Sequence, residues 1–203
     1  DLRQAPEVQQ GTGLVPGTRA DHLQLSYWLE RIEAPDAVLM SHEDIAVHQQ
    51  AISRSELGFY DLLAPVDPTV LTHEVNGRLA WILERMQDGR YVSAEGGPLL
   101  DTQMAMLAPQ QTPMAIAMSR HVALDNVRIR CSPLPEGYFT SPPNPDFDRN
   151  NCSTVRAQEA VQVLASWANG MRLVRTSYTL GWTDNAAALS PAMDEETFST
   201  WVA

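Results

Sequence analysis

The chain has two cysteines, Cys131 and Cys152, which are twenty-one positions apart. Cysteine can form a disulfide, bind a metal ion or act as a nucleophile. In an oxidising compartment such a pair usually closes a disulfide, and a bridged loop of that size contributes roughly 3 kcal/mol by chain-entropy arguments. Two buried free thiols are the alternative. Zinc takes four ligands, and no histidine or further cysteine stands at ligand spacing from this pair. We therefore predict a disulfide rather than a metal site.

A nucleophilic role for Cys152 would require a partner base. A thiolate nucleophile needs a base, usually histidine, within hydrogen-bond reach, and a third group that orients the base. All five histidines precede Cys152, and four lie in the half that we expect to be helical. His42 and His48 are six residues apart on one expected helix, about 240° around its axis, so they do not face one metal ion. We assign no catalytic residue, no metal and no cofactor, and we do not expect this chain alone to be an enzyme.

Aromatic side chains in the second half are the candidates for ligand binding. An aromatic ring with a polar group suits an extended peptide, because it offers both apolar area and a hydrogen-bonding atom. The alternative is that some of these rings, Trp182 above all, belong to the hydrophobic core. The four predicted ligand-binding residues are Tyr138, Trp167, Tyr178 and Trp182.

The first 112 residues are predicted to be a tether followed by a helical domain. Residues 1–17 mix proline and glycine with polar residues and should lie extended. Residues 18–112 favour three helices: one of about 15 residues that ends before Pro35, one opened by a capping box at Ser41 and Asp44, and one capped by Thr69 or Thr72. A stretch rich in proline, glycine and glutamine, residues 96–113, indicates a domain boundary. The apolar stripe of the third helix consists of Val75, Leu79, Ile82, Leu83 and Met86.

Beyond Pro113 the apolar periodicity changes from 3.6 to 2, which indicates strands in residues 113–190. Five prolines fall within residues 132–145, so this segment is predicted to be an irregular surface loop with Tyr138 at its tip. Asn169-Gly170 is typical of a two-residue hairpin turn, because these residues tolerate positive φ. Residues 191–203 should begin a linker helix. The fold class predicted from these patterns is α+β.

Charge and composition narrow the class of partner. The chain has 14 Lys+Arg against 25 Asp+Glu, a net charge of −11, and the basic residues are scattered. This argues against nucleic acid or anionic lipid as a partner. No apolar run approaches the ~18 residues that cross a bilayer. Because the first residue is Asp1 and not Met, we expect that a leader, an anchor or a tag has been removed, and we expect the protein to be periplasmic or secreted.

Two stretches of the chain resemble domains of one enzyme family. Residues 127–185 resemble the first bacterial SH3-like domain of NlpC-type peptidoglycan endopeptidases, which act on γ-D-glutamyl-L-diamino acid bonds. Residues 28–63 are similar to the helical, stabilising domain that precedes that barrel. The resemblance depends on Leu39-Met40-Ser41, Glu43-Asp44-Ile45, Tyr60-Asp61-Leu62-Leu63, Arg130, Gly137-Tyr138-Phe139, Asp146-Phe147-Asp148-Arg149 and Tyr178-Thr179-Leu180-Gly181-Trp182.

The resemblance implies a small SH3-like β-barrel over residues 113–190 and a role beside a catalytic domain. The family's catalytic cysteine, in an Asp-Cys-Ser-Gly-like motif with two downstream histidines, has no counterpart here. The expected function is that of a non-catalytic targeting and substrate-shaping region of an exported cell-wall endopeptidase. Its expected partners are peptidoglycan stem peptides or muropeptides and a catalytic NlpC-type domain or chain. Two alternatives are a stand-alone extracytoplasmic binding or scaffold protein and a cysteine hydrolase that uses Cys152.

Overall fold

The computed structural model describes residues 17–34, 36–53, 59–110 and 112–202, and the chain divides into two compact units, Asp1–Gln49 and Gln50–Ala203. Helices and antiparallel sheets are both present, which confirms the α+β class. The predicted tether lies almost wholly outside the described residues. Among the described helices, none combines the length and hydropathy that a membrane-spanning helix needs.

The described part of the first unit begins with two short helical segments. A 3-10 turn, η2, covers Ala20–Leu23, and the helix α1 covers Leu25–Leu29; neither has a buried residue. The prediction of one helix of about 15 residues is therefore wrong, since Gln24 adopts extended backbone (φ −95°, ψ 131°) between the two segments. Trp28 and Ile32 are 51% and 50% exposed. Short helices are marginal without tertiary packing, and these apolar side chains lack a buried surface that would hold a longer one.

The helix α2, His42–Ser53, begins at the capping box that the sequence predicts. The Asp44 amide donates to Ser41 Oγ (3.1 Å), and the Asp44 carboxylate accepts from the Ser41 amide (3.1 Å) and hydroxyl (2.6 Å). The hydrogen bond from the Ser41 hydroxyl, followed by that from its amide, lowers the pKa of Asp44. The two residues thus satisfy backbone donors at the start of the helix.

The long helix α3, Pro68–Gln87, belongs to the second unit. Its N-cap is Asp67, whose carboxylate accepts from the amides of Thr69 (2.7 Å) and Val70 (3.2 Å), so the prediction of a threonine cap is wrong. Asp67 is the better cap because Pro68 follows it at the first helical position, where no amide hydrogen is needed. Of the predicted stripe, Leu83 is half-buried and the buried members are Val75, Leu79, Ile82 and Met86.

Six strands form one antiparallel sheet in the second unit. The outer strands, β2 and β5, have no backbone pairing with each other among the described residues, so the sheet is not a closed barrel. The order across the sheet is β2 (Ser119–Val122), β6 (Ala160–Ser166), β7 (Arg172–Arg175), β8 (Leu180–Thr183), β3 (Val127–Arg130) and β5 (Asn151–Val155).

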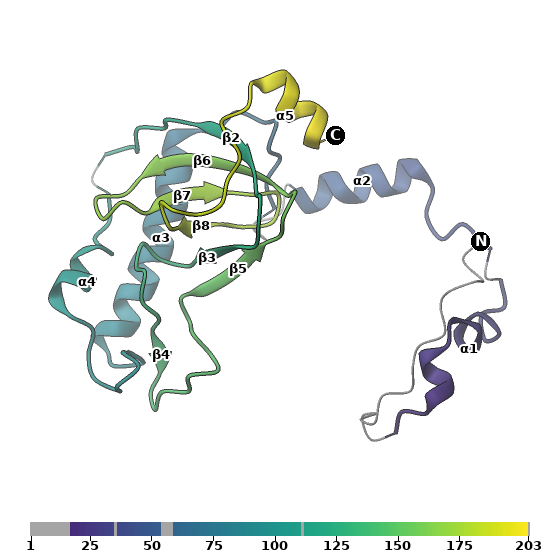
Figure 1. Ribbon diagram of the computed structural model, residues 1–203, viewed down its shortest axis with the longest axis horizontal. Coiled ribbons are helices and arrows are strands. Elements are labelled where there is room, and N and C mark those ends of the chain that lie inside the picture. Colours follow the sequence, from purple (N-terminus) through teal and green to yellow (C-terminus); the bar gives the residue numbers. More distant parts are fainter. Residues whose placement is uncertain (1–16, 35, 54–58, 111, 203) are drawn as a thin grey trace. The chain divides into compact units, whose positions relative to one another are not determined.

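Both faces of this sheet bury apolar side chains. On one face Leu164, Leu173 and Trp182 form a hydrophobic core with the stripe of α3, which crosses the sheet in Figure 1. On the other face a second cluster contains mainly valines from β3, β5, β6 and β7. Gly181 of β8 lies so close to β3 that an added Cβ would come within 2.4 Å of the Arg130 carbonyl oxygen. The glycine therefore permits the contact between these strands.

The β6–β7 hairpin turns at Asn169-Gly170, as predicted, but its loop is longer by one residue. Trp167 and Met171 are joined by a backbone hydrogen bond (2.7 Å), which leaves three residues in the loop. Gly170 has φ +84°, whereas Asn169 is not among the residues with positive φ. This is the combination of a turn and a left-handed glycine that closes three-residue hairpins.

Smaller elements complete the second unit. The strands β1 (Tyr91–Val92) and β4 (Phe139–Thr140) pair antiparallel, with Tyr91 opposite Thr140. The helix α4, Asp101–Ala105, falls within the stretch that the sequence marks as a boundary. The predicted terminal helix is present as α5, Glu195–Val202, and it buries Phe198.

Candidate functional site

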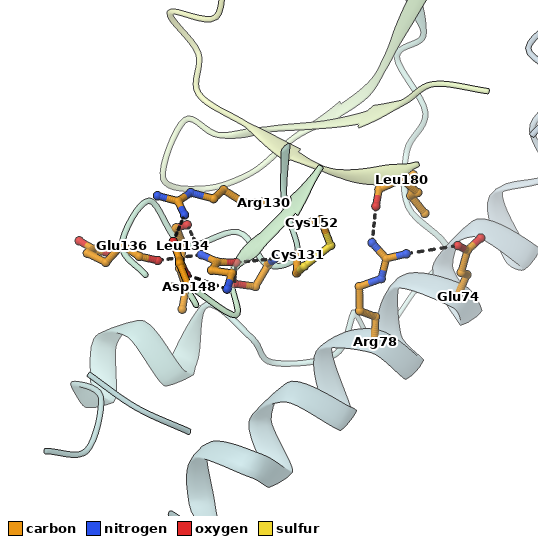
Figure 2. The surroundings of a disulfide bond; sticks show 11 residues. Glu74, Arg78, Arg130, Cys131, Leu134, Glu136, Asp148, Cys152 and Leu180 are labelled. Carbon is orange, nitrogen blue, oxygen red and sulfur yellow. Dashed lines mark hydrogen bonds and ion pairs between the residues drawn. A yellow bond between two sulfur atoms is a disulfide. The ribbon is translucent and has the colours of Figure 1, made fainter. Parts of the chain in front are cut away.

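The proline-rich segment between β3 and β5 is tied at its base by a disulfide. Cys131 and Cys152 are bonded to each other (S–S 2.06 Å), which fits the pair predicted from the sequence (Figure 2). Cys131 directly follows β3 and Cys152 lies in β5, and these strands pair from Val127 to Arg130. The covalent bond therefore closes the same loop that the strand pairing defines.

Asn150 is the internal hydrogen-bond centre of this loop. Its side chain is fully buried; its carbonyl oxygen accepts from the amide (3.0 Å) and hydroxyl (2.8 Å) of Ser132, and its amide donates to the carbonyls of Leu134 and Glu136 (both 2.7 Å). The prediction of an irregular surface loop is wrong in part, because Leu134 and Tyr138 are buried. Prolines lack an amide hydrogen, so the segment has few backbone donors for its own carbonyls. The side-chain amide of Asn150 donates to two of these carbonyls instead.

An ion pair fixes the outer part of the same loop. Arg130 contacts Asp148 (2.5 Å) and donates to the carbonyl of Pro135 (2.7 Å). The backbone at Gly137 runs against this carboxylate, and a Cβ there would lie 2.9 Å from three atoms of Asp148. Together with Asn150 and the disulfide, these contacts hold the loop in one arrangement.

A groove of about 690 Å³ lies between this loop and α3. Arg78, Trp81 and Ile82 of α3 form one wall, and Tyr91 of β1 lies beside them. Residues 145–149 and the two cysteines form much of the other wall. We call this feature the aromatic groove. Its volume falls within the range of about 300–1,000 Å³ that is usual for ligand sites.

Aromatic rings run along the groove from its rim to its floor. Trp81 contacts Tyr91 edge to face (ring centroids 6.0 Å apart), and Tyr91 contacts Tyr138 (5.1 Å). On the opposite side Phe147 is 58% exposed, and the Arg149 guanidinium lies 5.9 Å from its centroid. Exposed aromatic rings around a cavity are typical of binding sites rather than of monomer surfaces.

Tyr138 lies at the floor of the aromatic groove, with only 1% of its surface exposed. Its hydroxyl is buried without a hydrogen-bond partner. Burial raises the pKa of Tyr138, and the nearby Ser132 hydroxyl offsets part of that rise. The Ser132 hydroxyl donates its hydrogen to Asn150, and no hydrogen bond joins it to the Tyr138 hydroxyl. An unsatisfied buried hydroxyl costs about 1–3 kcal/mol, so it needs an explanation.

Arg78 links α3 to the sheet at the end of the groove. Its guanidinium donates to the Leu180 carbonyl of β8 and lies 3.6 Å from the Glu74 carboxylate (Figure 2). Glu74 also accepts a hydrogen bond from the Tyr60 hydroxyl. Burial, followed by the hydrogen bond with Glu74, raises the pKa of Tyr60 above its ordinary range. Arg78 is thus committed to contacts within the chain.

The other three predicted ligand-binding aromatics lie elsewhere in the second unit. Trp182 is fully buried and meets Trp167 edge to face (5.3 Å). Trp167 lines a separate cavity of about 390 Å³. Tyr178 is 37% exposed, and its hydroxyl donates to Glu159. The structure therefore brings Trp167 and Trp182 together and places Tyr138 alone of the four in the aromatic groove.

His121 of β2 is engaged away from the cysteines. Its Nε2 lies 2.8 Å from Ser119 Oγ, and its Nδ1 lies 2.8 Å from the Ser190 carbonyl oxygen. A carbonyl can only accept, so Nδ1 carries the hydrogen and Nε2 can accept from Ser119. Both sulfur atoms are in the disulfide, which leaves no thiol in the described structure for an imidazole to activate. The described residues contain no group of three or more side chains placed to hold a metal ion.

Most residues of the aromatic groove were not predicted from the sequence as site residues. Asp146, Phe147 and Arg149 belong to the family motif alone, and Trp81 and Tyr91 belong to no predicted site. One signal was available, because Trp81 falls outside the apolar stripe of an amphipathic helix and is 47% exposed. A large aromatic residue on the polar side of such a helix is an indication of a surface site.

Comparison with known proteins gives one line of evidence. No family model matches the chain, and no match was found among curated proteins. Among solved structures the chain is similar to a novel NlpC/P60 endopeptidase from Photobacterium damselae subsp. piscicida, with a TM-score of 0.50 and 13% identity. The likeness covers 80% of this chain and 42% of that chain, so the present chain spans less than half of the endopeptidase. At this identity the likeness concerns the fold.

Proposed function

We propose that this chain is a non-catalytic, substrate-shaping and targeting region of an exported NlpC-type cell-wall endopeptidase. The observation that carries the proposal is the fold likeness to an NlpC/P60 endopeptidase over 80% of this chain. The disulfide supports the non-catalytic part, because a cysteine peptidase needs a free thiolate and the only two cysteines are bonded to each other. Peptidoglycan is then the macromolecule that the chain contacts.

In this proposal the sheet of the second unit is an SH3-like domain and the preceding helices stabilise it. The six-stranded antiparallel sheet, with apolar clusters on both faces, is compatible with a curved barrel-like sheet. A stem peptide or muropeptide would be the ligand of the second unit, and a catalytic NlpC-type domain or chain would supply the thiolate. The disulfide favours a periplasmic or secreted location, where such bonds persist.

The proposal is tested by incubating the purified chain with insoluble peptidoglycan and with soluble muropeptides. We expect the chain to sediment with the insoluble wall and to leave the muropeptides uncleaved, as measured by mass spectrometry. Absence of sedimentation would contradict a wall-binding role. Cleavage that is lost in Cys152→Ala and retained in Cys131→Ala would contradict the non-catalytic role.

A second measurement addresses substrate shaping. When the chain is added to an NlpC/P60 catalytic domain, we expect the ratio of cleavage rates between two muropeptides to change. A change in both rates by the same factor would indicate tethering alone, and no change would favour a stand-alone binding protein.

A further inference from the structure

We infer that the aromatic groove binds a saccharide, so that within the proposed function, on which this inference rests, the chain contacts the glycan rather than the stem peptide. Some polar groups of the groove are engaged within the chain, others are not, and exposed aromatic rings lie beside them.

The charged groups deepest in the groove are paired within the chain. Arg78 contacts Glu74 and the Leu180 carbonyl, and Asp148 contacts Arg130. Asp146, Arg149 and Asn151 differ, since their side chains make no hydrogen bond or ion pair with the described residues. These three side chains are the polar groups that a ligand would meet.

The unpaired groups form a neutral and mixed set. Asp146 accepts hydrogen bonds, Arg149 donates them, and the Asn151 amide does both, so the formal charges of the three cancel. A phosphate-bearing or strongly acidic ligand would require an excess of positive charge, which is absent both here and in a chain of net charge −11. Sugar hydroxyls both donate and accept, and they match such a set without needing a net charge.

The aromatic rings supply the apolar part of the match. Phe147 and Trp81 are 58% and 47% exposed on opposite walls of the groove. The Arg85 guanidinium lies 3.5 Å from the Trp81 ring centroid and covers one face of that ring, whereas the Arg149 guanidinium lies farther from the Phe147 centroid, at 5.9 Å. Phe147 is therefore the better platform for the C–H face of a pyranose ring. Aromatic residues with polar neighbours give contact area together with orientation.

The buried hydroxyl of Tyr138 provides an independent indication of a ligand. It is almost fully buried at the groove, has no partner, and lies next to the half-buried Tyr91 ring. Because this hydroxyl is itself closed off from solvent, a sugar hydroxyl would satisfy it once a neighbouring side chain moves aside. The loop on which it stands is held by the disulfide and Asn150, so ligand binding would require little ordering of the chain.

The test uses the tetrasaccharide of N-acetylglucosamine as the probe and a sugar-free stem tetrapeptide as the comparison. Each is titrated into the ¹⁵N-labelled chain, and amide and indole shifts are followed by NMR. We expect the tetrasaccharide to shift signals of residues 145–151 and the Trp81 indole. Phe147→Ala should weaken binding by about tenfold, whereas Leu124→Ala should not change it, because Leu124 is 62% exposed and lies outside the groove.

Tyr138→Phe separates ligand binding from structural support. If the hydroxyl serves the ligand, this variant should bind the tetrasaccharide more weakly while its melting temperature stays equal or rises, because an unsatisfied buried group has been removed. Unchanged saccharide affinity in Tyr138→Phe would contradict the role of this hydroxyl.

The outcomes distinguish this inference from the proposed function. If the tetrapeptide shifts the groove signals and the tetrasaccharide does not, the saccharide assignment is wrong and the proposed function stands. If the tetrasaccharide binds but the chain fails to sediment with peptidoglycan, the groove is a saccharide site and the wall-binding function is wrong. No shift with either probe, in a chain with a dispersed native spectrum, contradicts the assignment.

Discussion

The helices α1 and α3 begin from similar sequence patterns and reach different structures. Both segments carry apolar residues at helical spacing, but α1 covers five residues and buries none, whereas α3 covers twenty and buries six. The difference lies in what each helix contacts. The stripe of α3 packs on a sheet, and Asp67 caps its start, whereas Leu25, Trp28 and Ile32 in the first unit remain exposed. Periodicity thus indicates a helix, and packing decides its length.

The largest expected effect comes from truncating a buried side chain of α3. Leu79→Ala should lower the free energy of unfolding of the second unit by about 2–5 kcal/mol, because it leaves a cavity under a fully buried side chain. Leu25→Ala, at a residue that is 40% exposed, should change it by about 0.5 kcal/mol or less. Urea unfolding followed by tryptophan fluorescence measures both, and equal effects would refute the distinction.

Removal of the disulfide should have the next largest effect. Replacing Cys131 and Cys152 together by alanine should cost roughly 3 kcal/mol, since the unfolded chain regains the freedom of the closed loop. Hydrogen exchange in residues 17–49 should stay unchanged, because the disulfide stabilises the second unit. Thiol titration of the unfolded wild-type chain without reductant serves as the check, and detection of two thiols would show that the bond is absent.

The two helix caps allow a smaller and more selective comparison. Asp67→Ala should lower the unfolding free energy of the second unit by about 0.5–2 kcal/mol, because two amides of α3 lose their acceptor. Ser41→Ala removes the corresponding contact at α2 and should reduce local helicity without shifting the unfolding midpoint of the core. Circular dichroism and urea unfolding of the two variants together measure this, and a shared midpoint shift would argue against independent units.

The smallest effect concerns pH dependence in the second unit. Burial, followed by the hydrogen bond to Glu159, raises the pKa of Tyr178 to about 12. The folded chain therefore keeps this proton to higher pH than the unfolded chain, and the stabilisation is lost as pH rises from about 10 toward 12. The ultraviolet absorbance of tyrosinate should lose this late step in Tyr178→Phe. An unchanged titration curve in that variant would mean that Tyr178 ionises as an ordinary tyrosine.

Part of the fold could be predicted because it depends on local patterns. The capping box at Ser41, the position of the turn at Asn169-Gly170 and the stripe of α3 each reflect preferences of neighbouring residues, and the structure contains all three. The division at residues 112 and 113 stays a prediction. Its basis was composition, while the packing of α3 with the sheet in one hydrophobic core depends on contacts between distant segments.

The sequence by itself determined the α+β class, the cysteine pair and the capping and turn residues, because these follow from residue type and short spacing. Only the tertiary structure decided that Tyr138 is buried and that Trp81, Tyr91 and Phe147 line one groove with it. These residues come from a helix, a short strand and a proline-rich loop, and no periodicity connects them. The groove exists because the packing of α3, the disulfide and Asn150 place those segments beside one another.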